Sequence, residues 1–299
     1  MLPAPQQGFV PTSDGLELFW RSTGEGSGPA LVCCNGIGVG TFFWEYLVRH
    51  FASTHQVVVW DYRGHGRSSA VEDKHRVDIP RMARDLGTVT SHLGLERPVI
   101  LGHSMGTQVI LEYYRQEPDK VGGLVSVLGT YGHPLDTFNN LAFSRQLFDL
   151  VIALNLGFPR AANALQKMIV SQPIAYDVAC QLGMVDKDRL SRHDLRQYLR
   201  GLTDIGFPLF FRMAAELGEH TARDLLPSVE APALVIAAEF DSFTPPKLAR
   251  ELNDNLRDSR YLELRGASHA GIVEQPEKIN AAVEQFLSDR VRHYREAND

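Results

Sequence analysis

Cysteine is rare in this sequence of 299 residues, which contains only Cys33, Cys34 and Cys180. So few cysteines are typical of a reducing compartment, and we expect a cytoplasmic protein. Cys33 and Cys34 are adjacent in an expected strand, where consecutive side chains point to opposite faces. The pair is poorly arranged to hold one metal ion, so we expect no metal site there and two small buried side chains.

Long apolar runs and an excess of positive charge are also missing. No run of about 18 apolar residues occurs, so no segment is expected to span a bilayer. Residues 1–6 lack the basic segment followed by an apolar stretch that marks a secretory signal. The formal net charge of −6 argues against nucleic acid or an anionic membrane surface as the main partner.

The chain does contain a regular alternation of apolar runs and helical patterns. With 44% hydrophobic and 22% charged residues, it is long enough for one ordinary globular core. Residues 8–10 and 16–20 predict an early hairpin. Strands buried on both faces are predicted at 30–34, 57–60, 98–101, 123–128 and 233–238, with a further strand at 260–264. Helices between these runs, as at 80–93, predict an α/β fold with a mainly parallel sheet covered on both faces.

This alternation stops near residue 130 and returns at residue 233. From about His133 to Leu226 the pattern is helical, rich in large apolar side chains and without a convincing buried strand. We therefore expect a core formed by residues 1–132 and 227–299, with an inserted helical unit at 133–226. Most of its apolar residues are expected to pack internally or on the core. Candidates for pocket walls are Phe138, Phe143, Phe207 and Phe211.

The most informative segment is 102–106, Gly-His-Ser-Met-Gly, which lies between an expected strand and a helix expected over 107–116. This is the G-x-S-x-G pattern of a nucleophile elbow. The turn from strand to helix is so tight that side chains two positions either side of the serine would clash. It holds the serine in a strained conformation and exposes its hydroxyl. Ser104 is therefore the predicted nucleophile.

A serine hydroxyl needs a base within hydrogen-bond reach and a group that orients this base. His269 follows the last expected strand, at the sheet edge where the elbow also lies, and is the predicted base. Asp241 leaves the preceding strand and is the predicted orienting acid. Glu239, two residues earlier, and Asp136 are alternatives for the acid.

The oxyanion that forms on attack needs backbone N–H donors. We predict that these belong to Met105, which follows the nucleophile, and to Ile37. Glycines at 36 and 38 let the backbone around Ile37 approach a ligand closely.

Other polar residues near these positions are expected to be structural. His103 lies beside the nucleophile but is expected to point elsewhere, and His65 is expected to support its own loop. Asp61 is expected to stabilise that loop through Arg63 or Arg67.

The elbow, the chain order Ser104, Asp241, His269 and the inserted helical stretch resemble the α/β-hydrolase fold superfamily. The similarity is greatest to its capped esterase, lipase and C–C hydrolase branch. Residues 61–68, DYRGHGRS, resemble the D-x-R-G-x-G-x-S segment of that branch, and residues 266–276 resemble its G-x-x-H…E-x-P ending. The resemblance implies a mostly parallel, eight-stranded, doubly wound sheet. It also implies a helical cap inserted after the sixth strand, and no cofactor.

Two positions distinguish this chain within the superfamily. The oxyanion loop usually begins His-Gly, whereas here it begins with Asn35. Asparagine can hydrogen-bond locally and tolerates turn geometry, so we expect the oxyanion site to be kept. Epoxide hydrolases and haloalkane dehalogenases carry an aspartate at the elbow, and Ser104 excludes that carboxylate nucleophile.

The predicted function is cleavage of a carboxylic ester of a small or medium apolar substrate through an acyl-enzyme intermediate. The same fold and triad are compatible with a C–C bond hydrolase, a lyase or a perhydrolase of the haloperoxidase kind. A small-molecule receptor with vestigial hydrolysis is a third alternative.

Overall fold

The computed structural model describes residues 3–134, 144–170 and 192–298. Cys180, the alternative acid Asp136 and the pocket candidates Phe138 and Phe143 lie outside these residues. Among the described helices, none is both long and apolar enough to cross a membrane.

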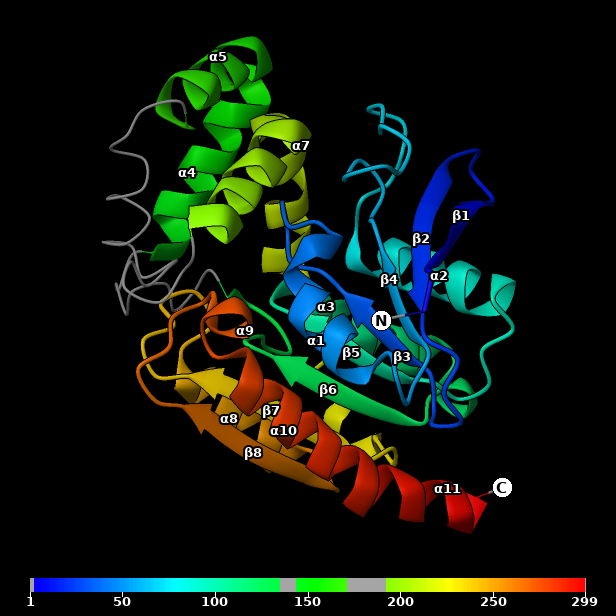
Figure 1. Ribbon diagram of the computed structural model, residues 1–299. Coiled ribbons are helices and arrows are strands. Elements are labelled where there is room, and N and C mark those ends of the chain that lie inside the picture. The colour runs from blue at the N-terminus through cyan, green and yellow to red at the C-terminus, as the bar shows by residue number, and fades with distance from the viewer. Residues whose placement is uncertain (1–2, 135–143, 171–191, 299) are drawn as a thin grey trace.

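An eight-stranded sheet runs through the centre of the molecule (Figure 1). Its spatial order is β1-β2-β4-β3-β5-β6-β7-β8. The strands are β1 (Gln6–Pro11), β2 (Glu17–Thr23), β3 (Leu31–Cys34), β4 (Val57–Trp60), β5 (Val99–His103), β6 (Gly123–Val127), β7 (Ala233–Ala238) and β8 (Ser259–Leu264). β2 pairs antiparallel with both β1 and β4, and every other pairing is parallel. The predicted α/β class with a mostly parallel sheet of eight strands is confirmed.

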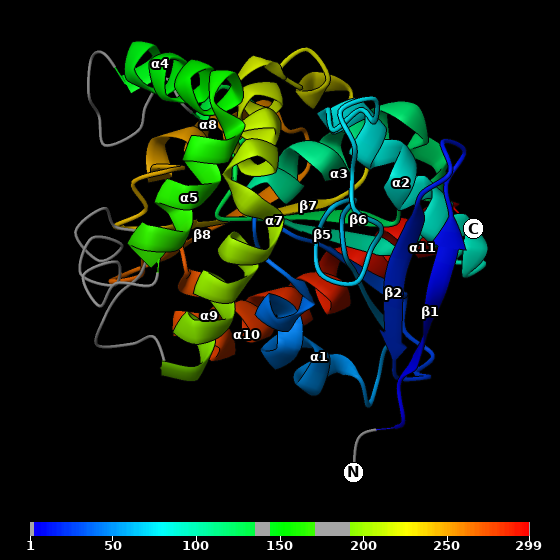
Figure 2. The ribbon, with the colours of Figure 1, turned by 90° about the horizontal axis from the view of Figure 1, so that it is seen from above.

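Helices cover both faces of this sheet (Figure 2). One face carries α2 (Ile79–His92), α3 (Met105–Gln116) and α8 (Pro246–Asn255), and the other carries α1 (Glu45–Phe51) and α10 (Pro276–Phe286). The chain ends in η6 (Leu287–Val291), a π-helical turn, and α11 (Arg292–Asn298). Cys33 and Cys34 are both buried, and each belongs to the apolar cluster of a different face. The expectation that these side chains point to opposite faces is confirmed.

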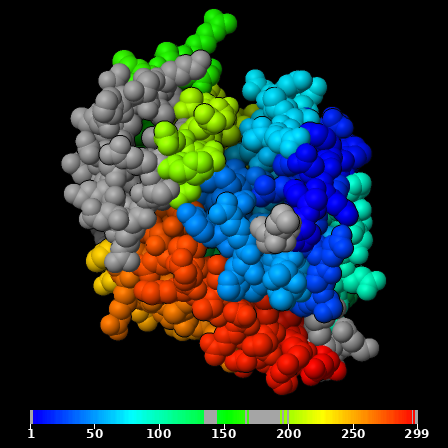
Figure 3. Space-filling model, in the orientation of Figure 1, coloured from blue at the N-terminus to red at the C-terminus, as the bar shows by residue number. Residues whose placement is uncertain are grey.

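Between β6 and β7 the chain forms α4 (Ser144–Gly157), α5 (Pro159–Val170) and α7 (Arg192–Glu219). Gly206 interrupts α7 with a φ of +73°, two residues before Pro208. A Cβ built on Gly38, in the loop after β3, would lie 2.5 Å from a Leu202 methyl group of α7. Figure 3 shows α7, in yellow-green, lying against the blue segment that contains this loop. The boundaries 133 and 226 for an inserted unit stay predictions.

The aromatic residues of α7 that sequence patterning suggested as pocket walls pack differently. Phe207 and Phe211 form a small apolar cluster with Ile152 of α4. They fill the space between helices α4 and α7, as most apolar residues of this segment were expected to do.

Candidate active site

Ser104 occupies a strained turn between β5 and α3. Its backbone has φ 54° and ψ −120°, in the left-handed half of the map that side chains rarely tolerate. A Cβ built on Gly102 would lie 2.3 Å from the carbonyl oxygen of Gly106. A Cβ on Gly106 would lie 2.5 Å from the carbonyl oxygen of Cys34 in the neighbouring strand. Both glycines are therefore required by contact distances, as expected for such a turn.

The hydroxyl of Ser104 lies at one end of a line of hydrogen bonds. Ser104 Oγ is 3.0 Å from Nε2 of His269, and Nδ1 of His269 is 2.8 Å from Oδ2 of Asp241. Because the carboxylate only accepts, Nδ1 carries the ring proton and Nε2 presents its lone pair to the serine. The three side chains come from the ends of β5, β7 and β8, which meet at one edge of the sheet. The structure thus brings together all three residues predicted for this line.

Asp241 is buried and well supplied with donors. Its Oδ1 accepts the backbone N–H groups of Phe243 and Thr244, each at 2.9 Å. The hydroxyl of Thr244 is 2.8 Å from its Oδ2. These contacts hold the carboxylate in one orientation toward His269. The contact of Thr244 could not be predicted, because the sequence around this residue carries no signal of it.

Glu239 has a different position from the one an orienting acid would need. Its side-chain oxygen accepts the backbone N–H of Gly266 at 2.8 Å, and the residue is exposed. It therefore supports the start of the loop that carries His269. Glu274 supports the same loop further on, because it accepts the backbone N–H of Ser268 at 2.8 Å. The role of Glu274 was not predicted, although its E-x-P pattern was noted.

The two backbone groups predicted to bind an oxyanion lie next to Ser104. A Cβ built on Gly36 would lie 3.1 Å from Cβ of Ser104, so the loop that carries Ile37 approaches the serine closely. Met105 is the first residue of α3, where the helix dipole favours negative charge. Among the described residues, neither N–H donates to a protein acceptor.

Asn35 explains how this loop is held without the usual histidine. Its side-chain amide donates to the carbonyl of Trp60 at 2.9 Å, and its Oδ1 accepts the indole N–H of Trp44 at 2.9 Å. The residue is 1% exposed, so both bonds are shielded from water. Asn35 thus ties the end of β3 to β4 and to the 3-10 turn η1 (Thr41–Trp44) that precedes α1.

In the segment 61–68, Asp61 holds its own loop, as expected. Oδ2 of Asp61 accepts the backbone N–H of Arg67 at 3.0 Å, as one of the two expected partners. The alternative partner, Arg63, pairs instead with Asp85 at 2.6 Å and with Asp14 at 2.9 Å. The guanidinium of Arg63 is fully buried, so it needs these two carboxylates as compensating charges.

Two small cavities flank Ser104. One, of about 50 Å³, has walls that include Gln108, Leu217 and Phe243. The other, of about 30 Å³, is lined by Ile37, Phe43, Tyr198 and His269, among others. Tyr198 belongs to α7, and its ring stacks on Phe43 at 6.2 Å between centroids. Burial raises the pKa of Tyr198 to about 12, so its hydroxyl remains a hydrogen-bond donor at neutral pH.

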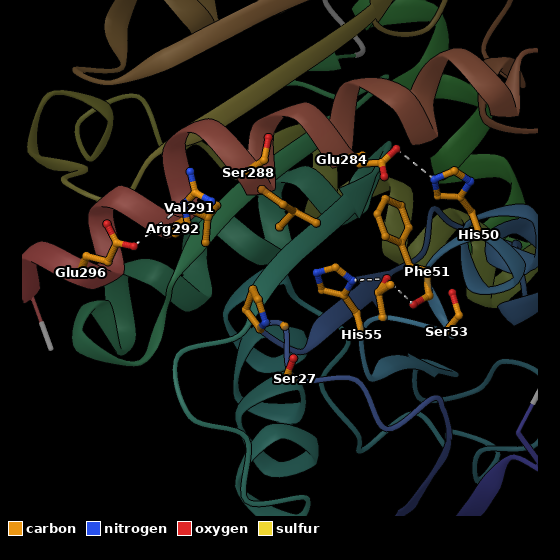
Figure 4. A pocket seen from close by; sticks show the side chains of 14 residues that line it. Ser27, His50, Phe51, Ser53, His55, Glu284, Ser288, Val291, Arg292 and Glu296 are labelled. Atoms are coloured by element: carbon orange, nitrogen blue, oxygen red, sulfur yellow. Dashed lines mark hydrogen bonds and ion pairs between the residues drawn. The ribbon is translucent and has the colours of Figure 1, made fainter.

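A larger groove, of about 890 Å³, lies at the opposite end of the strands (Figure 4). Residues that precede β3 and β4 form one side, and α10, η6 and α11 form the other. Its buried apolar groups are Phe51, Leu287 and Val291. The hydroxyl of Thr54 lies 2.8 Å from Nδ1 of His55. No carboxylate of a described residue hydrogen-bonds to His55, whereas Nε2 of His50, in the same groove, lies 3.4 Å from Oε2 of Glu284.

In the parts of the chain that the structure describes, no group of three or more His, Cys, Asp or Glu residues is placed to hold a metal ion.

Comparison with known proteins identifies the family of the chain. A family model described as the alpha/beta hydrolase fold matches residues 29–276. The 3-oxoadipate enol-lactonase 2 of Acinetobacter baylyi is 27% identical over 288 residues, covering 92% of this chain and 95% of the relative. The bifunctional esterase/perhydrolase DCH of Acinetobacter calcoaceticus is 23% identical over 302 residues, covering 94% and 99%.

A solved structure supports the same fold. The enol-lactonase from Burkholderia xenovorans LB400 superposes with a TM-score of 0.75 at 21% identity, covering 94% of this chain and 100% of that chain. That likeness concerns the fold alone. Because the family model spans most of the sequence and the sheet has the matching topology, the chain belongs to the alpha/beta hydrolase fold family.

Proposed function

We propose that this protein is a serine hydrolase that cleaves a carboxylic ester of a small or medium apolar substrate. The observation that carries the proposal is the continuous line of hydrogen bonds from Ser104 through His269 to Asp241, at 3.0 and 2.8 Å. The strained backbone of Ser104 supports it as well, because strain of this kind concentrates at functional sites.

In the first half-reaction, Ser104 Oγ attacks the carbonyl carbon of the ester while Nε2 of His269 takes the hydroxyl proton. The negative charge on the former carbonyl oxygen is stabilised by the N–H groups of Ile37 and Met105. Asp241 stabilises the imidazolium that forms. The bond to the alcohol oxygen then breaks, and His269 gives its proton to that oxygen, which leaves an acyl group on Ser104.

In the second half-reaction, a water molecule attacks the acyl carbon while His269 accepts one of its protons. The bond to Ser104 Oγ breaks, and His269 returns the proton to the serine as the carboxylic acid leaves. Every proton moves through Nε2 of His269, so the cycle needs no cofactor.

The proposed substrate range rests on the two cavities beside Ser104. They hold about 50 and 30 Å³ and are bordered by apolar side chains such as Leu217 and Phe43. We include in the proposal that the segment 133–226 acts as a cap, because Tyr198 and Leu217 of α7 contribute walls to these cavities. Short acyl or alcohol groups match this space best.

A second candidate is perhydrolysis, in which hydrogen peroxide replaces water in the second half-reaction and releases a peracid. The observation that favours it is the relative from Acinetobacter calcoaceticus, whose name gives both esterase and perhydrolase activity. C–C bond hydrolysis or lyase chemistry would use the same serine on a different substrate.

The first experiment is labelling with a fluorescent fluorophosphonate, which reacts with activated serines. Wild-type protein should be labelled, whereas Ser104→Ala and His269→Ala should lose labelling. Ser126→Ala is the matched control, because Ser126 is buried on the neighbouring strand and contacts the hydroxyl of Thr107 at 3.0 Å. A folded wild-type protein that is not labelled, or labelling that survives Ser104→Ala, would contradict the proposal.

Substrate turnover then separates the two candidates. Hydrolysis of p-nitrophenyl esters with acyl chains of two to twelve carbons supports an esterase. Addition of hydrogen peroxide, with peracid formation as the readout, tests the second candidate. Labelling at Ser104 with neither activity would move the chemistry to C–C bond cleavage.

A further inference from the structure

His65 belongs to the 61–68 segment, which the proposed reaction does not use. The residue is 2% exposed, yet its ring contacts the loop that carries the proposed oxyanion donor. Nε2 of His65 accepts the backbone N–H of Gly38 at 3.0 Å. Gly38 directly follows Ile37, so this side chain acts on the peptide next to the proposed donor.

The protonation of His65 follows from its second partner. Nδ1 lies 3.2 Å from the backbone carbonyl of Arg63, which only accepts, so Nδ1 carries the proton. Nε2 is then a bare acceptor for Gly38 N–H, and the contact needs a neutral ring. Burial lowers the pKa of His65 to about 4, so the ring is neutral near pH 7.

The bond to His65 acts on the central peptide of a turn. Val39 N–H reaches the carbonyl of Gly36 at 3.4 Å, which makes Ile37 and Gly38 the two central residues. Gly38 has a φ of +72°, the value that a type II turn requires at this position. Type I and type II turns differ by a flip of the central peptide. An acceptor for Gly38 N–H therefore selects one of the two orientations.

The carbonyl group of Gly38 is also confined, because α7 lies directly against it. A Cβ built on Gly201 of α7 would lie 2.4 Å from the carbonyl oxygen of Gly38. The absence of a side chain at Gly201 thus lets α7 lie directly on this loop. The peptide groups of Gly38 are confined between His65 on one side and α7 on the other.

The backbone carbonyl that accepts the Nδ1 proton of His65 is held in a fixed position. The carbonyl to which Nδ1 donates belongs to Arg63, whose guanidinium is fully buried between Asp85 and Asp14. A buried, doubly paired guanidinium fixes the backbone around it. The position of the His65 ring is therefore set by the core and does not depend on bound substrate.

We propose that His65 is a positioning residue for the proposed oxyanion site. By accepting the N–H of Gly38, it holds the turn so that the N–H of Ile37 faces the reacting oxygen above Ser104. This inference rests on the proposed function, because Ile37 matters only if an oxyanion forms at that place.

The test compares three variants with the wild type. His65→Phe keeps a ring but removes the acceptor, and His65→Gln restores an acceptor oxygen near the position of Nε2. Ser68→Ala is the matched control, because it removes a hydroxyl that bonds to Asp61 O at 2.6 Å in the same segment without touching Gly38. All variants are also unfolded in urea, so that loss of stability is measured separately.

With p-nitrophenyl acetate, His65→Phe should lower kcat by roughly 10- to 100-fold and leave KM within about threefold, since a misplaced oxyanion donor acts on the transition state. His65→Gln should recover part of this loss, and Ser68→Ala should keep kcat within about threefold of the wild type. A loss of kcat in His65→Phe no larger than in Ser68→Ala would overturn the inference.

A second readout does not depend on turnover. The backbone amide resonances of Ile37 and Gly38 should shift in His65→Phe and move back toward the wild-type values in His65→Gln. Unchanged resonances in His65→Phe would overturn the inference even if the enzyme is active. If the wild type hydrolyses no ester, the proposed function fails, whereas the resonances still decide whether His65 holds the loop.

Discussion

Nε2 of His103 lies 3.2 Å from the backbone carbonyl oxygen of His269. The carbonyl only accepts, so Nε2 carries the proton and Nδ1 of His103 is bare. Nδ1 is buried and has no hydrogen-bond partner among the described residues. The residue beside the proposed nucleophile thus holds the backbone of the proposed base, which links the two halves of the site directly. The expectation that His103 points elsewhere was wrong, because its ring reaches the loop that carries His269.

The role of Asp241 can be separated from that of Glu239 by matched amide variants. Asp241→Asn should lower kcat by about 10³- to 10⁴-fold, because the amide favours the wrong tautomer of His269 and does not stabilise its charged form. Glu239→Gln keeps an acceptor for Gly266 N–H and should stay within about threefold of the wild type. Steady-state kinetics on a short p-nitrophenyl ester gives both values. Equal losses in the two variants would remove the distinction between the acids.

Acyl chain length should matter strongly. The two cavities beside Ser104 are small, at about 50 and 30 Å³. We therefore expect kcat/KM for acetyl and butyryl esters to exceed that for dodecanoyl esters by at least about tenfold, a difference of about 1.4 kcal/mol in transition-state binding.

A cavity-enlarging variant tests the same relationship. Leu217→Ala should raise the octanoyl-to-acetyl ratio of kcat/KM, because Leu217 lines the larger of the two cavities. Leu150→Ala, at a leucine of α4 that is 57% exposed, should leave the ratio unchanged. A flat chain-length profile in the wild type would show that these walls do not limit the substrate.

The two buried hydrogen bonds of Asn35 predict that a substitution at this position lowers the free energy of unfolding. Asn35→Asp would place carboxylate oxygen against the carbonyl of Trp60, where an amide N–H now donates. We expect a loss of about 2–4 kcal/mol in the free energy of unfolding, because a buried donor is lost and two acceptors face each other.

Asn155 of α4 offers the control, since its side-chain amide also donates to a carbonyl, that of Val151, at 2.7 Å near the surface. Asn155→Asp should cost less than about 1 kcal/mol, because water can solvate the groups that lose their partner. Urea unfolding of both variants is the measurement. Similar losses would mean that burial of the Asn35 bonds has little weight.

Local patterns account for the parts of this molecule that were predicted correctly. The strands that precede Ser104 and Asp241 are short, buried apolar runs, and the elbow needs glycines at fixed positions. The carboxyl ends of parallel strands share one edge of the sheet, so three distant residues could be expected to meet there.

Contacts between loops could not be read in the same way. His65 and Gly38 are 27 positions apart and approach only because two loops leave neighbouring strands at the same edge. Arg63 and Arg67 were both possible partners of Asp61, and the fold brings Asp85 of α2 beside Arg63 and leaves Arg67 to Asp61. Such pairings depend on how elements pack, and residue type alone does not distinguish between nearby carboxylates.

Two of the buried histidines, His65 and His103, predict that the protein loses stability at acid pH. Burial lowers the pKa of His65 to about 4; burial and the charge of neighbouring His269 lower that of His103 to about 3. In the unfolded chain both groups titrate near 6.5, so the unfolded state binds protons first as the pH falls. Stability is therefore complete above pH 6.5 and is lost as the pH falls toward 4 and 3.

At pH 5.0 each of these histidines should cost about 2 kcal/mol of unfolding free energy relative to pH 7.5. His103→Gln removes one titrating group and keeps an amide that can donate to the carbonyl of His269. Its loss between the two pH values should be smaller than that of the wild type by about 2 kcal/mol. His293→Gln, at an exposed position in α11, is the control and should keep the wild-type difference. Urea titrations at both pH values give these differences, and an undiminished loss in His103→Gln would show that His103 is not buried in its neutral form.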